Sequence, residues 1–407
     1  MPWLEVAPNP SPIGRATGRT RASACSRRTR GEITTHLHAA ITGLPQRTTR
    51  GTAPKPAVAP LSASPSPRGR RICIVLMSAV GDVVHALPVV NALRRHEPES
   101  RISWVLHPGP ATLVRGHPSV DEIITLDRRR GWRAFAELRR PLRDHRFDLT
   151  IALQDYFKAG IVTALTRAPE RLGYDRARAR DLSWIFTNRR IAAHPRAHIQ
   201  DEFLEFAAAL GVPAEPLEWR LGPWPEERVW QAELRARVGA PYAALVIGSS
   251  RPEKDWLPER WAELASALAA DFGLRTVIAG GRSPREAATE RAVLERAGAS
   301  SVSALDSGLR RLVGILDAAA LTVSLDTGPL HIAVALERPV VSLMAYTNPA
   351  RYGPYRRYQD LVVNAYGDPM RGGVLATDRR PGRMARITVR EVLEKVERWR
   401  ARYAAGA

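Results

Sequence analysis

The feature that most constrains the fold of this chain is a repeated alternation of short apolar runs with helical patterns. Residues 71–77 (RICIVLM) form an apolar run typical of a strand buried on both faces, and a helical pattern follows over 83–96. Strands that alternate with helices predict βαβ units and therefore a parallel sheet. Further elements of this first array are expected as strands at 102–106, 122–126 and 149–153 and as helices at 132–145 and 201–210.

The alternation restarts after residues 211–225, which contain four prolines and two glycines and are typical of a linker. The second array is expected to hold strands at 243–247, 276–279, 321–325 and 339–344, and helices at 258–271, 285–297, 309–319, 328–336 and 389–403. The pattern predicts an α/β protein with domains at 70–225 and 226–388 and a C-terminal helical segment at 389–407. Ligands in such sheets bind beyond the carboxyl ends of the strands, so we expect the site between the two sheets.

The first 69 residues have a different composition. They are rich in Arg, Ser, Thr, Pro, Ala and Gly and show neither helical nor strand periodicity. Such a segment cannot bury enough apolar surface to offset the entropy lost on ordering, so we predict a disordered basic extension. A basic arm or transit-type peptide is the functional interpretation, and a mis-assigned translation start is the alternative.

The formal net charge of +20 is compatible with a nucleic acid, an anionic membrane surface or an acidic substrate as partner. Almost half of the excess lies in residues 1–70, which hold 11 basic side chains against Glu5 and Glu32. In the rest of the chain the excess is scattered, and no RNA- or DNA-binding motif accompanies it. We therefore expect no nucleic-acid partner.

Two cysteines, Cys25 and Cys73, suffice for neither a disulfide scaffold nor a zinc site. Cys73 lies in an apolar run and is interpreted as a small core residue, which fits a reducing compartment. The longest apolar stretch, residues 72–90, is interrupted by Asp82 and His85, so no segment meets the length of a membrane-spanning helix.

Four motifs follow expected strands, and the first is MSAVGDVVHALP over residues 77–88. Gly81 permits a tight turn, and Asp82 lies where the next helix starts. Capping of that helix is one explanation for an acidic residue there. The same turn also places a carboxylate at the edge of the predicted site, where a general base for a substrate hydroxyl would lie.

The second and third motifs combine features of an anion site. GSSRPEKDWLP (248–258) presents hydroxyls and Lys254 after a strand, a set that grips phosphate oxygens but does not have the spacing of a Walker loop. A solvated polar loop is the alternative. LDTGPLH (325–331) precedes a short helix whose free N–H groups bind anions, and Asp326 is expected to cap it. The fourth motif, YTNPARYGP (346–354), predicts a loop.

Together these motifs predict a diphosphate clamp in the second domain opposite a carboxylate in the first. That arrangement suits transfer of a group from a nucleotide-linked donor to a hydroxyl. The clamp would stabilise the charge that develops on the leaving diphosphate, and the carboxylate would deprotonate the acceptor.

The four motifs, in this order, resemble glycosyltransferase family nine, the ADP-heptose:lipopolysaccharide heptosyltransferases, from about residue 71 to 354. The resemblance implies a GT-B fold, in which two Rossmann-like domains with parallel sheets face each other across a cleft. It implies inverting sugar transfer without a bound metal or other cofactor, from a nucleotide-sugar donor to an anionic lipid-linked glycan. It also implies a cytoplasmic enzyme in peripheral contact with the inner membrane.

Residue by residue, the resemblance assigns Asp82 as the catalytic base and Lys158 and Arg180 as acceptor binders. It places Glu286 near the nucleoside ribose, and it leaves His331 open between a site residue and helix packing. The residues assigned to the donor phosphates are Ser249, Ser250, Lys254, Asp326, Thr327 and Gly328.

The chain departs from the family pattern at four positions close to the expected donor pocket, which are Pro329, Ala345, Tyr346 and Asn348. These departures bear on which sugar the donor pocket accepts. A transferase or epimerase of the same fold with another nucleotide sugar is therefore the alternative, and a non-catalytic binder of sugar nucleotides or nucleic acid is the alternative from another class.

Overall fold

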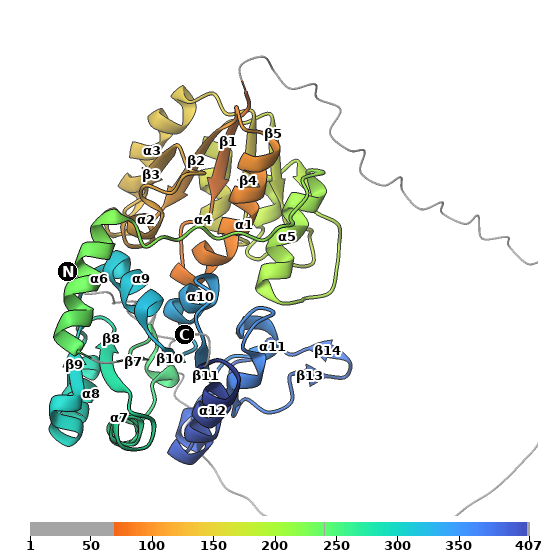
Figure 1. Ribbon diagram of the computed structural model, residues 1–407. Helices are drawn as coiled ribbons and strands as arrows, with labels where there is room; N and C mark the ends of the chain where they lie inside the picture. The colour runs from red at the N-terminus through yellow and green to blue at the C-terminus, as the bar shows by residue number, and fades with distance from the viewer. Residues whose placement is uncertain (1–68, 240, 405–407) are drawn as a thin grey trace, which may run out of the picture. The chain divides into compact units, whose positions relative to one another are not determined.

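The computed structural model describes residues 69–239 and 241–404, which form two six-stranded parallel sheets with helices around them (Figure 1). This arrangement confirms the predicted α/β architecture. The expectations for residues 1–68, including the disordered extension and Cys25, lie outside the described residues. None of the helices in the described ranges is long and apolar enough to cross a membrane.

The first sheet has the strand order β3-β2-β1-β4-β5-β6, with all neighbouring strands parallel. Its strands are β1 (Arg71–Val75), β2 (Arg101–Leu106), β3 (Glu122–Thr125), β4 (Leu149–Ala152), β5 (Glu170–Gly173) and β6 (Arg189–Arg190). The helices of this half are α1 (Val80–His96), α2 (Pro108–Val114), α3 (Trp132–Asp144), α4 (Phe157–Leu165) and α5 (Ile199–Ala209), with 3-10 turns η1 (Arg128–Arg130) and η2 (Ser183–Phe186).

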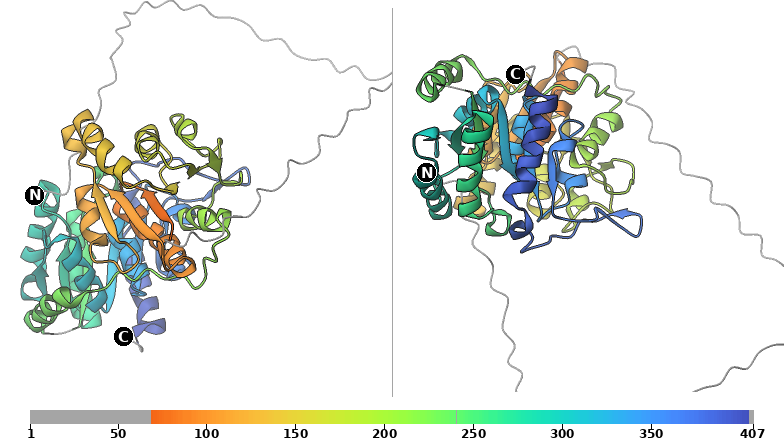
Figure 2. Two further views of the ribbon diagram at one scale, coloured as in Figure 1. Left: turned by 90° about the horizontal axis from the view of Figure 1, so that it is seen from above. Right: turned by 60° about the horizontal axis from the view of Figure 1, so that its bottom comes forward.

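Side chains of β1 alternate between the two faces of this sheet, because successive residues of a strand point to opposite sides. Ile72, Ile74 and Leu76 join the core beneath α1, α2 and α5. Cys73 and Val75 join the core beneath α3 and α4. Figure 2 (left) shows α3 in gold on one side of the orange strands and α1 in orange on the other. Cys73 is fully buried and its pKa is raised by that burial, which confirms a core cysteine.

The second sheet has the order β12-β11-β10-β7-β8-β9 and is also parallel. Its strands are β7 (Tyr242–Val246), β8 (Arg275–Ala279), β9 (Ser301–Ser303), β10 (Leu321–Leu325), β11 (Val340–Met344) and β12 (Val362–Asn364). Its helices are α6 (Pro225–Val238), α7 (Pro258–Phe272), α8 (Pro284–Ala297), α9 (Gly308–Ala318), α10 (Gly328–Ala335), α11 (Pro349–Tyr352) and α12 (Val389–Arg402). The remaining elements are η3 (Pro252–Lys254), η4 (Gly298–Ser300), η5 (Gln359–Leu361), η6 (Met384–Arg386) and a hairpin of β13 (Met370–Arg371) and β14 (Val374–Leu375).

The elements that the sequence predicts lie where expected, within about three residues at each end. The prediction was incomplete for short or weakly apolar elements, because a strand of two to four residues carries too little periodicity to be recognised. The elements it missed are α2, α4, α6, α11, β5, β6, β9, β12 and the β13–β14 hairpin. The expected linker has no helix or strand from 210 to 224, and α6 begins at its last proline, Pro225. The domain boundaries themselves stay a prediction.

Several contacts hold the two halves together. Helices α1 and α10 pack against each other where β1 and β10 end (Figure 1). Beside them, Arg351 of α11 donates from Nη1 and Nη2 to the two carboxylate oxygens of Glu202 in α5, at 2.5 and 3.1 Å. Both side chains of this ion pair are buried, at 6% and 0% exposure. Tyr355 adds a hydrogen bond of 2.5 Å to Asp201.

Arg351→Met is expected to lower the free energy of unfolding by about 3 kcal/mol or more, because it leaves the Glu202 carboxylate buried without its principal partner. Chemical denaturation monitored by fluorescence measures this change. Arg356→Met is the matched control, since the Arg356–Glu215 pair is more than half exposed and should contribute less than about 1 kcal/mol. Equal losses in the two variants would contradict a structural role for the buried pair.

Candidate active site

Asp82 lies in the first turn of α1, directly beyond the carboxyl end of β1. The helix begins at Val80, three residues earlier than the sequence predicts, so Asp82 is its third residue. One carboxylate oxygen, Oδ2, accepts a hydrogen bond of 3.0 Å from the backbone N–H of Ala79. Asp82 therefore satisfies a helix-terminal N–H, as the capping interpretation proposed, and among the described residues no hydrogen bond to Oδ1 is found.

The surroundings of Asp82 raise its pKa from 3.8 to about 6, chiefly because burial disfavours the charged carboxylate. The negative charge of Asp155 adds to the rise, whereas the hydrogen bond from Ala79 and the positive charges of Arg351 and Lys254 oppose it. A carboxylate with a pKa of about 6 is mostly ionised at pH 7 and is a stronger base than an ordinary aspartate. This is the property that a general base requires.

The turn that carries Asp82 is fixed by a residue that the sequence analysis missed. Gln154, just after β4, accepts a hydrogen bond of 3.0 Å from the N–H of Met77 and donates one to the carbonyl of Ser78. Its side chain is buried. A glutamine after an expected strand gives no signal of this role, because the partner turn lies more than 70 residues away in the sequence.

His331 packs on the backbone of the same turn. A Cβ atom added at Gly81 would lie 2.7 Å from Cδ2 of His331, so only glycine allows this approach. The ring of His331 also lies 4.3 Å from that of His85, which in turn neighbours His198 at 5.6 Å. Burial lowers the pKa of His331 to about 3, so the ring is neutral. Helix packing, one of the two expected roles, is what this geometry supports.

Lys254, at the end of η3, forms an ion pair with Asp326. Its Nζ donates a hydrogen bond of 2.7 Å to Oδ2 of Asp326 and one of 2.9 Å to the Asp326 carbonyl. Thr347 donates to the same Oδ2 atom. The ammonium group has three protons, so one remains for a phosphate oxygen after these two bonds. The face of Tyr346, one of the departures from the family pattern, lies 5.9 Å from Nζ.

Asp326 does not cap α10, contrary to expectation. The N-cap residue is Thr327, whose side chain makes no capping bond, while the Asp326 carboxylate faces Lys254 and Thr347. Gly328 brings the start of α10 close to the first half, since a Cβ atom there would lie 2.8 Å from Cβ of Val80. Pro329 has no N–H, so this helix end offers one donor fewer to an anion than an ordinary helix.

The two serines of the second motif have different environments. Ser249 is buried, and its hydroxyl lies 2.6 Å from the Arg251 carbonyl and 2.7 Å from Oδ1 of Asp255. Ser250 is exposed. The structure thus gives Ser249 a role in shaping the loop, and only Ser250 presents its hydroxyl to solvent.

Glu286 lies at the carboxyl ends of β7 and β8, beneath Gly248 and Gly280. Its two carboxylate oxygens accept hydrogen bonds of 2.7 and 2.9 Å from the N–H groups of Gly281 and Ser283. The second bond belongs to the capping box of α8. The structure therefore shows Glu286 fixing the β8–α8 turn, and contact with a ribose stays a prediction.

Asn348, another departure from the family pattern, uses its side-chain amide group for hydrogen bonds within the protein. As N-cap of α11, its Oδ1 accepts a hydrogen bond of 2.9 Å from the N–H of Ala350. Its Nδ2 donates hydrogen bonds of 2.8 and 2.7 Å to the carbonyls of Pro369 and Ala376. An aspartate could not donate these two bonds. The asparagine therefore attaches the β13–β14 hairpin to the α11 turn.

The two residues expected to bind the acceptor lie in the first half beyond β4 and β5. Lys158 is exposed in the first turn of α4. Arg180 is 63% exposed and is held by Asp155 through two hydrogen bonds of 3.0 Å. Arg178, from the same basic segment as Arg180, does not face the acceptor side. Arg178 is 3% exposed and forms ion pairs with Asp175 and Glu205, which anchor its loop.

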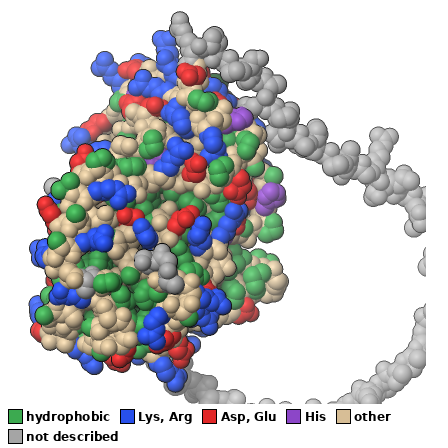
Figure 3. Space-filling view, viewed as in Figure 1, with side chains coloured by type: hydrophobic (Ala, Val, Ile, Leu, Met, Phe, Trp, Pro, Cys, Tyr) green, Lys and Arg blue, Asp and Glu red, His purple; other side chains and the backbone are tan. Residues whose placement is uncertain are grey.

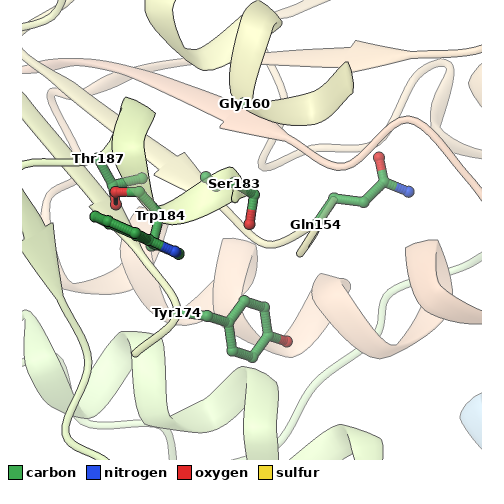
Figure 4. A pocket seen from close by; sticks show the side chains of 8 residues that line it. Gln154, Gly160, Tyr174, Ser183, Trp184 and Thr187 are labelled. Atoms are coloured by element: carbon green, nitrogen blue, oxygen red, sulfur yellow. Dashed lines mark hydrogen bonds between the residues drawn. The ribbon is translucent and has the colours of Figure 1, made fainter. Parts of the chain in front are cut away.

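Figure 4 shows the small cavity beside this loop, bordered by Gln154, Tyr174, Ser183 and Trp184. At about 10 Å³ it has room for about one water molecule and is too small for a sugar. Within residues 69–239 and 241–404, no group of three or more His, Cys, Asp or Glu side chains is placed to hold a metal ion. The expectation that no metal is needed stays a prediction.

Comparison with known proteins identifies relatives of this chain. The family described as glycosyltransferase family 9 (heptosyltransferase) matches residues 135–371. The lipopolysaccharide core heptosyltransferase OpsX of Haemophilus influenzae is 30% identical over 300 residues, which cover 73% of this chain and 85% of that protein. Lipopolysaccharide heptosyltransferase 1 of Escherichia coli K12 is 30% identical over 302 residues, 71% of this chain and 92% of that protein.

A solved structure agrees with these matches. The E. coli heptosyltransferase WaaC with ADP-2-deoxy-2-fluoro heptose superposes with a TM-score of 0.66 at 25% identity, covering 81% of this chain and 99% of that one. The likeness extends over both sheets and confirms the expected GT-B architecture. By its sequence, its fold and its four motifs, the chain belongs to glycosyltransferase family 9 and is a glycosyltransferase.

Proposed function

We propose that this protein transfers a heptose from ADP-heptose to the core of a lipopolysaccharide, with inversion at the anomeric carbon. The names of the relatives support this substrate class. One observation of the structure carries the proposal for the reaction. Gly328, two residues after the Asp326 that pairs with Lys254, lies so close to Val80, two residues before Asp82, that an added Cβ atom would come within 2.8 Å of the Val80 side chain. A base and a phosphate-binding cation from opposite halves thus lie close to one another.

Asp82 is the proposed base. Its carboxylate takes the proton of the acceptor hydroxyl while the hydroxyl oxygen attacks the anomeric carbon of the donor sugar. The bond from that carbon to the diphosphate oxygen breaks on the opposite side, and ADP leaves with the electron pair. Burial keeps the pKa of the carboxyl at about 6, so it is ionised before the reaction and basic enough to accept the proton.

The donor diphosphate is proposed to lie against Lys254, Ser250 and the turn of residues 326–328. Lys254 keeps one N–H for a phosphate oxygen, while its bonds to Asp326 fix where the ammonium group lies. A cation held in advance of the reaction stabilises the charge of the leaving diphosphate without reorganising. Ser249 shapes the loop that carries Ser250 and Lys254, and Glu286 fixes the neighbouring β8–α8 turn.

On the acceptor side, we assign Lys158 and Arg180 to anionic groups of the lipid-linked glycan. Both side chains are exposed beyond strands of the first sheet, on the edge that also carries Asp82. Peripheral contact with the cytoplasmic face of the inner membrane and transfer without a bound metal are parts of the same proposal. On the face that Figure 3 shows, Lys and Arg side chains are spread over both halves and mixed with acidic ones, so a nucleic-acid partner is not favoured.

The donor is tested by thermal shift with ADP-heptose and with UDP-, GDP- and CDP-sugars. Because ligand binding to the native state raises the melting temperature, we expect a rise with ADP-heptose alone. Lys254→Ala should weaken ADP-heptose binding by about tenfold or more, since it removes a charge-assisted hydrogen bond. Lys395→Ala, in α12, is the matched control and should keep the wild-type shift. A rise with another nucleotide sugar instead would favour the same-fold alternative.

Asp82→Asn is expected to lower kcat by about 10²–10⁴-fold, because general-base catalysis is lost. Donor affinity should be almost unchanged, since Asp82 lies outside the diphosphate site. The melting temperature should not fall at pH 7, because the raised pKa shows that the ionised carboxylate is unfavourable in the folded protein. Asp144→Asn, an exposed change in α3, is the control. A variant that keeps more than about a tenth of wild-type turnover would leave Asp82 with the capping role alone.

The acidic limb of the pH profile of kcat/KM should have an apparent pKa of about 6. Below that pH, burial favours the protonated carboxyl of Asp82, and the rate should fall about tenfold per pH unit. The measurement needs an acceptor without phosphate monoesters, because these groups also titrate near pH 6. A limb near the ordinary aspartate pKa of 3.8 would show that the base is not a buried Asp82.

A further inference from the structure

Several large apolar side chains are exposed along one rim of the first sheet. Among the described residues they are Trp132 at 68%, Phe157 at 40%, Leu182 at 59% and Ile185 at 51% exposure. They follow β3, β4 and β5, the strands whose carboxyl ends point toward the edge that carries Asp82. Helices α3 and α4 pack together and α4 packs on η2, so the four side chains belong to neighbouring elements. We call this set the apolar rim.

The elements that carry the apolar rim are packed against one another. The Trp132 ring lies 5.4 Å from that of Phe135, and the Phe157 ring meets that of Phe186 edge to face at 5.3 Å. Gly160 of α4 lies so close to Phe186 that an added Cβ atom would come within 2.2 Å of its ring. The exposed side chains are therefore presented by packed elements and not by a free loop.

Arginine surrounds the apolar rim. Residues 127–146 contain eight arginines and three acidic residues, a net charge of +5. Three of these arginines, Arg128–Arg130, form the exposed η1 turn directly before Trp132. The buried stripe of α3 is Ala134, Leu138 and Leu142, which leaves its arginines on the outer face. Beyond β5, Arg176 is also exposed and stacks on Trp184 at 4.1 Å.

We propose that the apolar rim and the η1 arginines form a docking surface for an anionic lipid bilayer. Tryptophan and isoleucine beside clustered arginine match the two parts of a membrane interface, which are acyl chains and anionic headgroups. The proposal rests on the proposed function, in which the acceptor is lipid-linked. Since the rim lies on the sheet edge that carries Asp82, docking there presents the base to the membrane surface.

The test is co-sedimentation of the full chain with vesicles of 30% phosphatidylglycerol in phosphatidylethanolamine, compared with pure phosphatidylcholine vesicles. We expect binding to the anionic vesicles alone. Trp132→Ser/Ile185→Ser and Arg128→Gln/Arg129→Gln/Arg130→Gln should each lower the vesicle partition coefficient by about tenfold or more. Residues 1–68 are identical in all variants, so a difference between variants reports on the rim.

Two matched controls have their changes elsewhere on the surface. Val229→Ser removes an exposed apolar side chain of α6. Arg235→Gln/Arg237→Gln/Arg291→Gln removes three exposed arginines of α6 and α8, and thus the same charge as the η1 variant. Both controls should bind anionic vesicles as the wild type does. Rim variants that bind like the wild type, or controls that lose as much, would overturn the proposal. Self-association that Trp132→Ser abolishes would assign the rim to a second copy and overturn it as well.

A second measurement separates this proposal from the proposed function. With a delipidated acceptor fragment in solution, the rim variants should keep wild-type transfer within about twofold, because the residues that they change are none of those assigned to the donor, the acceptor or the base. With acceptor in vesicles, their transfer should fall in parallel with binding. If the wild type binds vesicles through the rim but transfers no heptose to the fragment, the docking surface stands and the assigned activity fails.

Discussion

The close approach of α1 and α10 is the contact on which the site depends. Each helix starts just beyond the carboxyl end of a central strand, one in each sheet, and each has a glycine at the point of contact. Side chains at Gly81 or Gly328 would lie within 3 Å of His331 or Val80. Asp82 follows Gly81, and Asp326 lies two residues before Gly328. Contact at the helix ends therefore brings the proposed base and the proposed phosphate site together.

Most of the ionisable groups buried around this contact are either paired with an opposite charge or neutral. Lys254 is paired with Asp326, and Arg351 with Glu202. The imidazole of His331 stays neutral because burial holds its pKa at about 3. Asp82 is the exception, since burial, with the like charge of Asp155, outweighs the cations near it and raises its pKa. A group whose pKa is raised in this way, at the meeting point of two domains, is typical of an active site.

Much of the fold was predictable because both sheets consist of strands buried on two faces, which form continuous apolar runs such as 72–77 and 243–247. The location of the site followed from the same pattern, since parallel strands end at one edge. The roles of single side chains were harder to predict. Asp326, Ser249 and Glu286 follow strands as expected, but their hydrogen bonds run to Lys254, Asp255 and Gly281, partners that only the fold defines.

Arg178 and Arg180 show the same limit most clearly, since they are two residues apart in one basic segment. Sequence treats them alike, whereas the structure buries Arg178 between two carboxylates and leaves Arg180 exposed beside Asp155. Net charge therefore says little about which cations are available to a ligand. Where arginine is already paired inside the protein, as at Arg178 and Arg351, it maintains the fold. Where it surrounds exposed apolar side chains, as at Arg128–Arg130 beside Trp132, its ion pairs with Asp127 and Glu137 lie on the surface, and the arginines stay exposed to an external anion. In this protein the two uses of arginine occur in different segments, so the basic composition serves both the joining of the halves and the surface around the site.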